Sequence, residues 1–457
     1  MDKVTSSGVF WNTLGGMLNA GQSALILMVV AYGLDITVSG FVSIAFATAN
    51  LFMALAKYGV RNYQVTDAKR QFSFWDYFWG RTISVASALL LLLLYLSALF
   101  FSESYTMEKT LAVFEACILK LIDALEDVYG GEYQRRGRLD IAGKIMTLRL
   151  AVSTCLICLV LIGGGGICLS LFGGIIISIL VDIFCIWRAR SQISCSGSIW
   201  QPKRVKALLR SCFPLCVGST LAIYLGNAPK FMIDRYMDET VQGIFGYLMM
   251  PVFVITLLNN FIYQPIVRTM GILWEEKNKQ EFVKRIYRQV KLLLLLTLFI
   301  LCVGGSIGLP VLSVVYHTEL SGYWLEFLLL LMGGSLYAFA YYLTVVLTTI
   351  RRQKTVAVGY IIVTAFNLLC GKQFLTENGV MGASKFYLCS NFLLVTIYIM
   401  FLLGNRLLSF PLFSKRDFMS PHHSTNQSCV KKDWKKIKSG TRFIFVSLIN
   451  GFREYKS

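Results

Sequence analysis

Five ionisable side chains lie inside one otherwise apolar stretch, residues 110–129: Glu115, Lys120, Asp123, Glu126 and Asp127. On a helix that turns 100° per residue they fall within one arc of about 140°. A charge near the centre of a membrane costs roughly 2.5–3.5 kcal/mol on insertion scales, so such charges are expected to pair or to face water. The pattern predicts a helix with one polar face that lines a transport pathway. The alternative is a packing salt-bridge network, in which Lys120 pairs with Asp123 or Asp127.

A second cation lies near the end of the apolar stretch 208–231. Lys230 follows Asn227 and Pro229, and it could face a cavity and attract an anion. It could equally pair with Asp234, because residues four apart share one face of a helix. Arg149 is a third cation inside an apolar stretch.

Amide side chains occur in other apolar stretches and suit hydroxyl-rich ligands. Taken singly, such side chains more often link neighbouring helices. The amides are Asn12, Asn19, Gln22, Asn259, Asn260, Gln264 and Asn367.

The composition indicates what kind of elements must position these groups. Of 457 residues, 56% are hydrophobic and 15% are charged, whereas soluble domains are about 45–50% apolar and about 25% charged. A membrane helix needs about 20 mainly apolar residues. The sequence therefore predicts an all-α polytopic membrane protein with about twelve spans. Their ranges are 9–32, 38–56, 82–101, 110–129, 145–163, 167–187, 208–231, 244–267, 290–313, 323–348, 356–376 and 380–403.

The positive charge of the chain follows this topology. The chain holds 44 Lys and Arg against 25 Asp and Glu, and the basic residues gather in every second loop. Since Lys and Arg accumulate on the cytoplasmic side, both termini are expected in the cytoplasm and a nucleic-acid partner is not expected. The remaining loops are short, which disfavours a membrane glycosyltransferase or polymerase.

The cysteines and histidines give no sign of an enzyme. Cys155 and Cys158 form a C-x-x-C, but they lie in an apolar stretch without a nearby His or second cysteine pair. The chain has three histidines in all. We therefore expect no catalytic residue, no metal and no cofactor.

A polar, basic segment divides the chain into two groups of six spans. The predicted organisation is an N-terminal lobe at 1–187, a cytoplasmic linker at 188–207, a C-terminal lobe at 208–404 and a basic tail at 405–457. Two such lobes commonly leave a substrate cavity between them near the midplane. The tail is either an amphipathic helix on the inner leaflet or a disordered segment.

Several short segments, in this order on a twelve-span frame, carry a resemblance to a known family. They are Phe10-Trp11-Asn12, Asp127-Val128-Tyr129 through Gln134, Arg138 through Lys144, Asn227 through Asp234 with Gly243-Ile244-Phe245, and Asn378 through Ala383. Over about residues 1–403 the chain resembles the polysaccharide flippases of the MATE-like (multidrug/oligosaccharidyl-lipid/polysaccharide, MOP) superfamily. The tail has no recognisable counterpart.

The resemblance implies two six-helix lobes around a central cavity in a bacterial plasma membrane. It implies alternating access that moves polyprenyl-pyrophosphate-linked oligosaccharide, a precursor of O-antigen, capsule or exopolysaccharide, to the outer leaflet. Lys120, Lys230 and Arg149 would then bind the pyrophosphate, the amides would bind the sugars, and the tail of the lipid would stay among membrane lipids. Glu115, Asp123, Glu126 and Asp127 would couple transport to protons or sodium. Other polysaccharide-assembly proteins are possible partners.

Three other functions remain open from the sequence. A cation-coupled drug exporter of the same superfamily would favour an aromatic, acidic cavity. A membrane-embedded enzyme such as a polymerase or ligase would need a polar cluster in an outside loop, which is lacking. A scaffold that recruits glycosyltransferases would rely on the basic tail.

Overall fold

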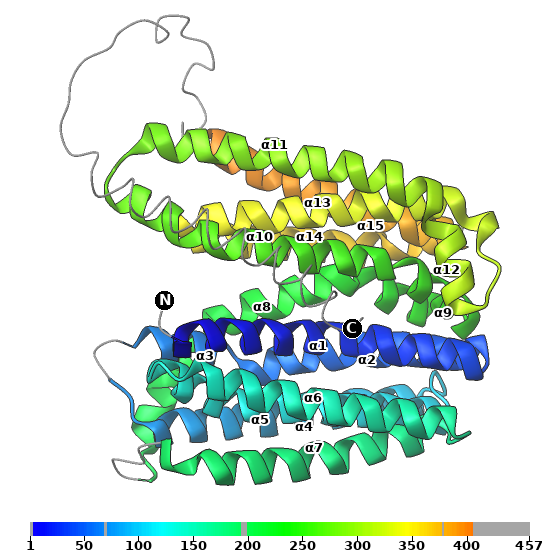
Figure 1. Cartoon of the computed structure of the whole chain (residues 1–457). Helices are drawn as coiled ribbons and strands as arrows, with labels where there is room; N and C mark the ends of the chain where they lie inside the picture. The colour runs from blue at the N-terminus through cyan, green and yellow to red at the C-terminus, as the bar shows by residue number, and fades with distance from the viewer. Residues whose placement is uncertain (1–2, 68–70, 193–198, 377–378, 405–457) are drawn as a thin grey trace, which may run out of the picture. The chain divides into compact units, whose positions relative to one another are not determined.

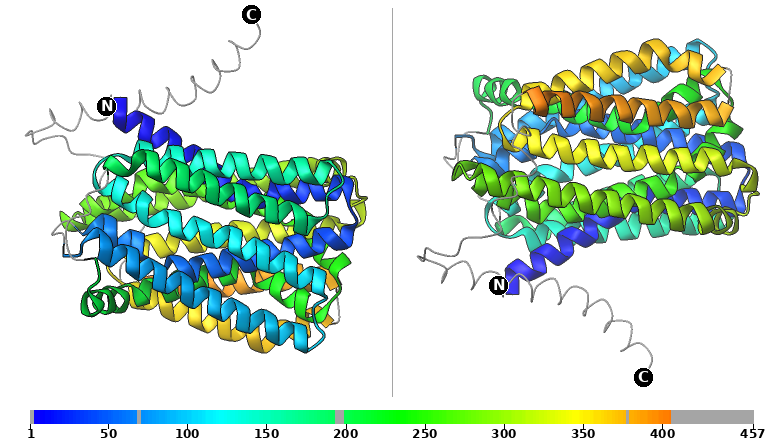
Figure 2. Two further views of the ribbon diagram at one scale, coloured as in Figure 1. Left: turned by 90° about the horizontal axis from the view of Figure 1, so that it is seen from below. Right: turned by 90° about the horizontal axis from the view of Figure 1, so that it is seen from above.

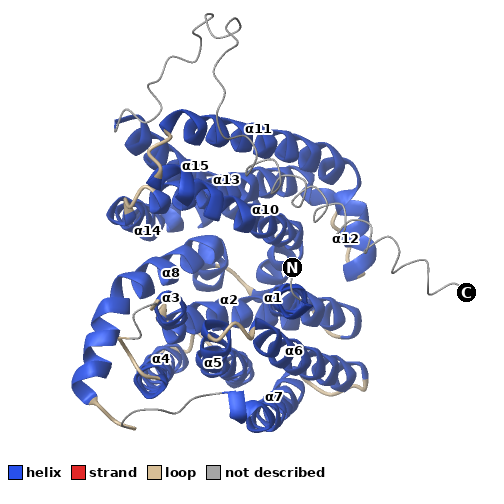
Figure 3. Ribbon diagram, turned by 60° about the vertical axis from the view of Figure 1, so that its left-hand side comes forward, coloured by secondary structure: helices blue, strands red, loops and turns tan. Residues whose placement is uncertain are grey.

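The computed structural model describes residues 3–67, 71–192, 199–376 and 379–404, with side chains except at 3–6, 192 and 256–268. The described residues form α-helices and no strand (Figure 3). The described residues belong to one compact unit. The predictions for the tail at 405–457 lie outside the described residues.

The first seven helices pack mainly against one another (Figure 1). They are α1 (Lys3–Gly33), α2 (Ile36–Lys57), α3 (Val60–Thr66), α4 (Phe74–Phe101), α5 (Met107–Arg135), α6 (Leu139–Ile162) and α7 (Ile167–Ala189). We call this set the N-terminal group. Helix α5 contacts α2, α3, α4, α6 and α7, so most of its surface is covered by protein.

A second set of helices forms the C-terminal group, seen in front in the right panel of Figure 2. It contains α10 (Met250–Glu275), α11 (Lys279–Val303), α12 (Leu309–Tyr316), α13 (Trp324–Thr349), α14 (Gln353–Thr376) and α15 (Gly379–Gly404). A π-helical turn, Gly304–Gly308, joins α11 to α12 into one continuous helical run. The division into lobes at 1–187 and 208–404 with a linker at 188–207 stays a prediction.

Helix α8 (Pro202–Tyr236) contacts both groups. Leu208, near its start, shares a small core with Tyr77 of α4 in the N-terminal group. Further along, Leu225 lies in the core of the C-terminal group, and the hydroxyl of Tyr337 on α13 donates to the carbonyl of Ala222 (3.2 Å). One helix therefore crosses from one group to the other.

The predicted eighth span, 244–267, is two helices. Helix α9 (Glu239–Leu248) ends just before α10, which has Pro251 in its first turn. Because proline has no N–H, it cannot continue the hydrogen-bond ladder of the preceding helix. The spanning segment begins at Met250, and α9 is a short separate helix between α2 and α8.

A close crossing holds α1 against α6. A Cβ atom on Gly143 of α6 would lie 2.5 Å from the backbone nitrogen of Asn12 and 2.6 Å from the carbonyl carbon of Trp11. Only glycine permits this approach of the two backbones. The contact sets the distance between the helices that carry Asn19 and Arg149.

Ten described helical segments are long and apolar enough to cross a membrane. Helix α5 is long enough but carries the ionisable residues noted above, and α10 has 26 residues with part of its side chains not described. With these two, the structure matches the predicted number of about twelve spans. The chain is an all-α, multi-pass membrane protein.

Candidate functional site

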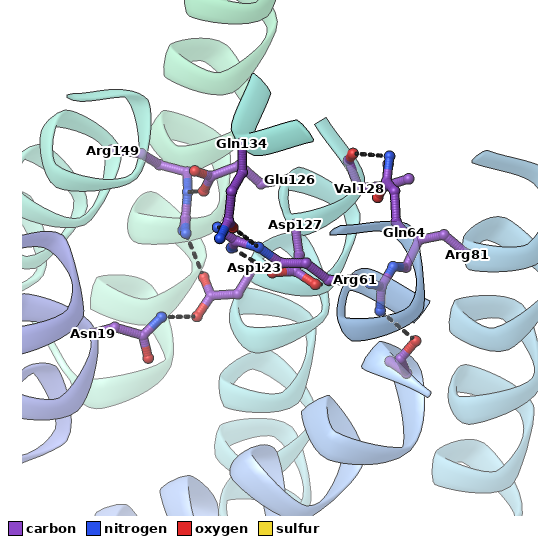
Figure 4. Close-up of polar contacts among 11 residues, drawn as sticks. Asn19, Arg61, Gln64, Arg81, Asp123, Glu126, Asp127, Val128, Gln134 and Arg149 are labelled. Carbon is purple, nitrogen blue, oxygen red and sulfur yellow. Dashed lines mark hydrogen bonds and ion pairs between the residues drawn. The ribbon is translucent and has the colours of Figure 1, made fainter. Parts of the chain in front are cut away.

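Arg149 of α6 is the centre of a buried ion-pair network (Figure 4). Its guanidinium lies 2.6 Å from Asp123 Oδ1 and 2.6 Å from Glu126 Oε2, both on α5. It also lies 3.3 Å from Asp182 Oδ1 on α7. The side chain of Arg149 is 1% exposed, so these pairs form away from water.

Lys120 and Asn19 complete the network on the side of α1. Lys120 Nζ lies 3.3 Å from Asp123 Oδ2, and it donates to the side-chain oxygen of Asn19 (3.3 Å). The amide of Asn19 donates to the same carboxylate oxygen of Asp123 (3.0 Å). We call Asn19, Lys120, Asp123, Glu126, Arg149 and Asp182 the Arg149 network. It joins α1, α5, α6 and α7.

The geometry of this network makes it rigid. Removing one partner of a buried ion pair usually costs about 3–5 kcal/mol because the other charge stays buried. Lys120 and Arg149 are each 1% exposed, and each is held in a buried ion pair. The sequence left two interpretations of Lys120 open, a place on a polar pathway or an ion pair with Asp123 or Asp127. The structure contains the ion pair with Asp123.

A second cluster surrounds Asp127, the residue that follows Glu126 on α5. Arg61 of α3 lies 2.9 Å from Asp127 Oδ1 and Arg81 of α4 lies 2.7 Å from Oδ2. Arg61 also donates to the side-chain oxygen of Gln134, and Arg81 donates to the carbonyl of Ala56 (3.1 Å). The predicted polar arc of α5 is thus divided: Asp123 and Glu126 face α6 and α7, whereas Asp127 faces α3 and α4.

The amide candidates are spread through the protein. Gln22 is buried and donates to Thr154 of α6 (3.1 Å). Asn367 of α14 is buried and accepts from Ser390 of α15 (2.6 Å). Asn12 is half-buried on α1, and the side chain of Asn259 is outside the described set. Gln22 and Asn367 therefore link neighbouring helices, and among the amide candidates whose side chains are described, Asn19 is the one that contacts the charged candidates.

Glu115 lies apart from the network, one helical turn before Lys120. It is buried, and one of its carboxylate oxygens has no hydrogen-bond partner among the described residues.

Lys230 is placed differently from Lys120 and Arg149. It is half-buried on α8, and no ion pair or hydrogen bond joins it to any side chain that the structure describes. The alternative partner, Asp234, is engaged elsewhere: it lies 2.8 Å from Lys109 of α5 and accepts from the hydroxyl of Tyr105. The pair between Lys230 and Asp234 does not form.

Two further features are the cysteines of the C-x-x-C and a cavity with a mainly apolar wall. Cys155 is exposed and Cys158 half-buried, and both thiols are free. A cavity of about 580 Å³ lies among α11, α13 and α15, with Leu301, Phe339 and Phe392 in its wall. In the described part of the chain, no group of three or more His, Cys, Asp or Glu is arranged to hold a metal ion.

Comparison with solved structures identifies the fold. An inward-facing multidrug-resistance MATE-family transporter of the MOP superfamily has a TM-score of 0.59 at 13% identity, over 85% of this chain and 95% of that one. A mutant of a Vibrio cholerae MATE transporter has a TM-score of 0.61 at 12% identity, over 89% and 99% of the two chains. An outward-facing multidrug-resistance MATE-family transporter of the MOP superfamily has a TM-score of 0.57 at 13% identity, over 89% of this chain and 97% of that one. The chain has the fold of MOP-superfamily transporters.

Comparison with family models gives the family. Residues 6–269 match the family described as "Polysaccharide biosynthesis protein". The match covers more than half of the chain, and the chain belongs to this family. No curated protein matches the sequence.

Several charged residues of the site were not among the predicted candidates. Asp182 is a single acid in the apolar stretch 167–187, and Arg81 and Lys109 lie near ends of spans, where the sequence suggested loop charges. The signal available for Asp182 was its charge inside a span, the same signal that identified Arg149. Its distance from α5 along the chain gave no indication that they meet.

Proposed function

We propose that the chain moves polyprenyl-pyrophosphate-linked oligosaccharide from the inner to the outer leaflet by alternating access. Membership of the polysaccharide biosynthesis family and the MOP transporter fold support a transporter for such material. The observation that carries the proposal is the state of Lys230, a cation in a membrane helix without a partner among the described side chains.

An unneutralised lysine in a membrane helix is costly, and a bound anion offsets that cost. Lys230 lies on α8, the helix that contacts both groups, where a cargo between the groups would pass. A pyrophosphate offers several acceptor oxygens to an ammonium group. A cationic drug would instead be repelled by Lys230, which favours the anionic cargo.

Lys57 is the second cation that we assign to the cargo. It is half-buried in the last turn of α2, the helix that packs against α5. No ion pair fixes its ammonium group to a described side chain. Lys57 can therefore turn toward a pyrophosphate, whereas Lys120 and Arg149 would first have to break buried pairs. We assign to those two the support of the site.

The carboxylates of the Arg149 network are the proposed coupling groups. Asp123, Glu126 and Asp182 are three carboxyl groups that face the two cationic side chains of Lys120 and Arg149. A proton or a sodium ion that joins the network would balance its charge. Glu115 and Asp127 remain further candidates. Transport driven by an ion gradient would follow if binding of that ion favours one conformation.

The proposed location is a bacterial plasma membrane with both termini in the cytoplasm. The alternation of basic loops supports this orientation. Basic segments follow the last residue of α5, precede the first residue of α8 and follow the last residue of α10, and these three ends lie on one side of the membrane when each long helix crosses it once. The sugars of the cargo would lie among the half-buried amides, such as Asn12, and its polyprenyl chain among membrane lipids. Other polysaccharide-assembly proteins would supply the lipid-linked units and polymerise them.

The test uses a bacterium that lacks its own oligosaccharide flippase and contains the matching glycosyltransferases. Wild type should restore surface polymer, Lys230→Ala should lower it at least about tenfold, and Lys230→Arg should retain part of it. The matched control is Lys372→Ala, because Lys372 is an exposed lysine on α14. Equal export by Lys230→Ala and Lys372→Ala would refute the role of Lys230. Failure of wild type, with the protein and the lipid-linked precursor both present, would refute the function.

A drug exporter is the second candidate, favoured by the excess of carboxylates in the Arg149 network. In liposomes it should move ethidium against a proton or sodium gradient, and Asp182→Asn should abolish that movement. Movement of a labelled lipid-linked sugar without ethidium efflux would exclude it.

A further inference from the structure

An ion-pair cluster joins the N-terminal group to α8 and α9 at one end of the protein. Lys109, in the first turn of α5, lies 2.8 Å from Asp234 Oδ1 and 3.1 Å from Glu239 Oε1. Tyr105 donates its hydroxyl to Asp234 Oδ2 (2.5 Å). The side chains of Lys109 and Asp234 are 5% and 7% exposed, so this contact is largely shielded from water.

Local sequence places these charges at helix ends. Thr106 caps α5 by accepting from the backbone N–H of Lys109 (3.3 Å), and Asp238 caps α9 by accepting from that of Val241 (2.9 Å). Asp234 lies in the last turn of α8, and Glu239 is the first residue of α9. The two acids therefore come from consecutive helices and meet one lysine from a helix far away in the chain.

The backbones of α2 and α9 touch beside this cluster. A Cβ atom on Gly40 of α2 would collide with the carbonyl oxygen of Glu239, and one on Gly243 of α9 would lie 2.6 Å from the carbonyl oxygen of Ile36. The hydroxyls of Tyr247 and Ser39 form a buried hydrogen bond of 2.6 Å across the same contact. The two backbones meet directly at these glycines, so α2 and α9 are in close contact here.

The apolar cores show the same asymmetry along the helices. Toward the Lys109 end, one continuous core contains Ala116 of α5, Phe245 of α9 and Phe327 of α13. Toward the other end, Tyr133 of the N-terminal group and Tyr342 of the C-terminal group belong to separate cores. The two groups are thus joined at the Lys109 end.

We propose that Lys109, Asp234 and Glu239 form an ionic lock that holds the Lys109 end shut. The topology puts this end outside, so the lock opens each time cargo leaves; this direction rests on the proposed function. Opening separates Lys109 from the acids and lets water reach all three. Loss of one partner harms the shut state, in which the remaining charges are shielded, more than the open state, in which they are hydrated. Variants of the lock should therefore favour the open state.

The test measures access to the contact between α2 and α9 and needs no cargo. In a variant without native cysteines, Ser43→Cys places a thiol at a buried position of α2 that faces Gly246. The purified protein in lipid nanodiscs is treated with a charged maleimide. Lys109→Met should raise the labelling rate at least about fivefold, the lower end of typical coupling between two states. Lys109→Arg should keep the slow rate, because it keeps the charge.

Two controls separate opening of this end from a loose fold. Ser153→Cys places a thiol at a buried position of α6 within the N-terminal group, and its labelling should not change with Lys109→Met. Arg235→Met removes an exposed cation beside Asp234 and should also have no effect. Unchanged labelling of Ser43→Cys in Lys109→Met would overturn the lock. A parallel rise at Ser153→Cys would overturn it too, because the fold as a whole would then be loosened.

A milder variant covers the case in which Lys109→Met does not fold. Glu239→Gln alters the partner that is 36% exposed and leaves the buried pair of Lys109 and Asp234 in place. It should raise labelling of Ser43→Cys by a smaller factor, about twofold. Equal rates for Glu239→Gln and wild type would contradict a lock that includes Glu239. Because this readout is conformational, it can succeed even if the proposed cargo is wrong.

Discussion

Asp182 lies 3.3 Å from the Nε atom of Arg149 and so makes this arginine the shared partner of three carboxylates on two helices. This relationship ties α7 to α5 through α6. It also gives the Arg149 network three carboxyl groups against the two cationic side chains of Lys120 and Arg149.

The first prediction concerns the stability of this network. Arg149→Met should lower the free energy of unfolding by about 3–5 kcal/mol, because it leaves Asp123 and Glu126 buried without their main cation. Asp182→Asn should stay within about 1 kcal/mol of wild type, since two cations then face two carboxylates. Thermal unfolding of the purified proteins in detergent measures both. A loss for Asp182→Asn as large as that for Arg149→Met would show that all three carboxylates are needed as anions.

The second prediction separates support from cargo binding. Lys120→Ala should lower both thermal stability and flipping, because Lys120 is buried against Asp123. Lys57→Ala should lower flipping several-fold at unchanged stability, because no described side chain pairs with Lys57. Liposome flipping of a labelled lipid-linked sugar, together with unfolding curves, tests this. The assignment fails if Lys57→Ala flips normally.

A third prediction uses the crossing of α1 and α6. Gly143→Ala should destabilise the protein by about 1–3 kcal/mol, since the new methyl group has no room beside Asn12. Gly16→Ala on α1 is the matched control: a Cβ atom there meets nothing within 4 Å. Alanine is the better helix former, so that change should be neutral or stabilising by up to about 1 kcal/mol. Similar unfolding temperatures for the two variants would contradict the close crossing.

The fourth prediction concerns Asp67, in the turn between α3 and α4. Burial tends to raise the pKa of this carboxyl, but the N–H groups of Gln71 and Phe72 and the hydroxyl of Tyr77 donate to it and hold its pKa below the usual value. A lowered pKa stabilises the fold at pH values above the unfolded pKa of about 3.9, and this contribution disappears as the pH falls through the folded pKa.

Asp67→Asn should therefore be less stable than wild type near neutral pH, and the difference should shrink below about pH 4. Unfolding temperatures across that range measure it. A difference that stays constant down to the lowest pH would mean that the charge of Asp67 does not contribute.

The sequence allowed the spans to be predicted closely because apolar length is a local property. The predicted span 356–376 corresponds to α14, Gln353–Thr376, and 167–187 corresponds to α7, Ile167–Ala189. The prediction was wrong at 244–267, where Pro251 begins a new helix. The short helix α3 was missed because it is too short and polar to resemble a span.

The site was harder to predict because partners depend on which helices meet. The charged arc of α5 was visible, but its division between Arg149 and Arg81 follows from the packing of α5 among five helices. Lys230 and Asp234 are four residues apart and could pair on one face of a helix, yet Asp234 instead pairs with Lys109, which lies 125 positions earlier in the chain. Residue spacing along one helix cannot reveal such distant partners.

The passage of α8 across both helix groups bears on how the two parts of the chain could assemble. Leu208 and Cys212, near the start of α8, share a small apolar core with Val60 and Tyr77 of the N-terminal group. A fragment that starts at α8 would thus supply apolar side chains that complete a core of the fragment that ends at α7. We therefore expect the two fragments, when they are expressed separately in one cell, to associate in the bilayer through this shared core.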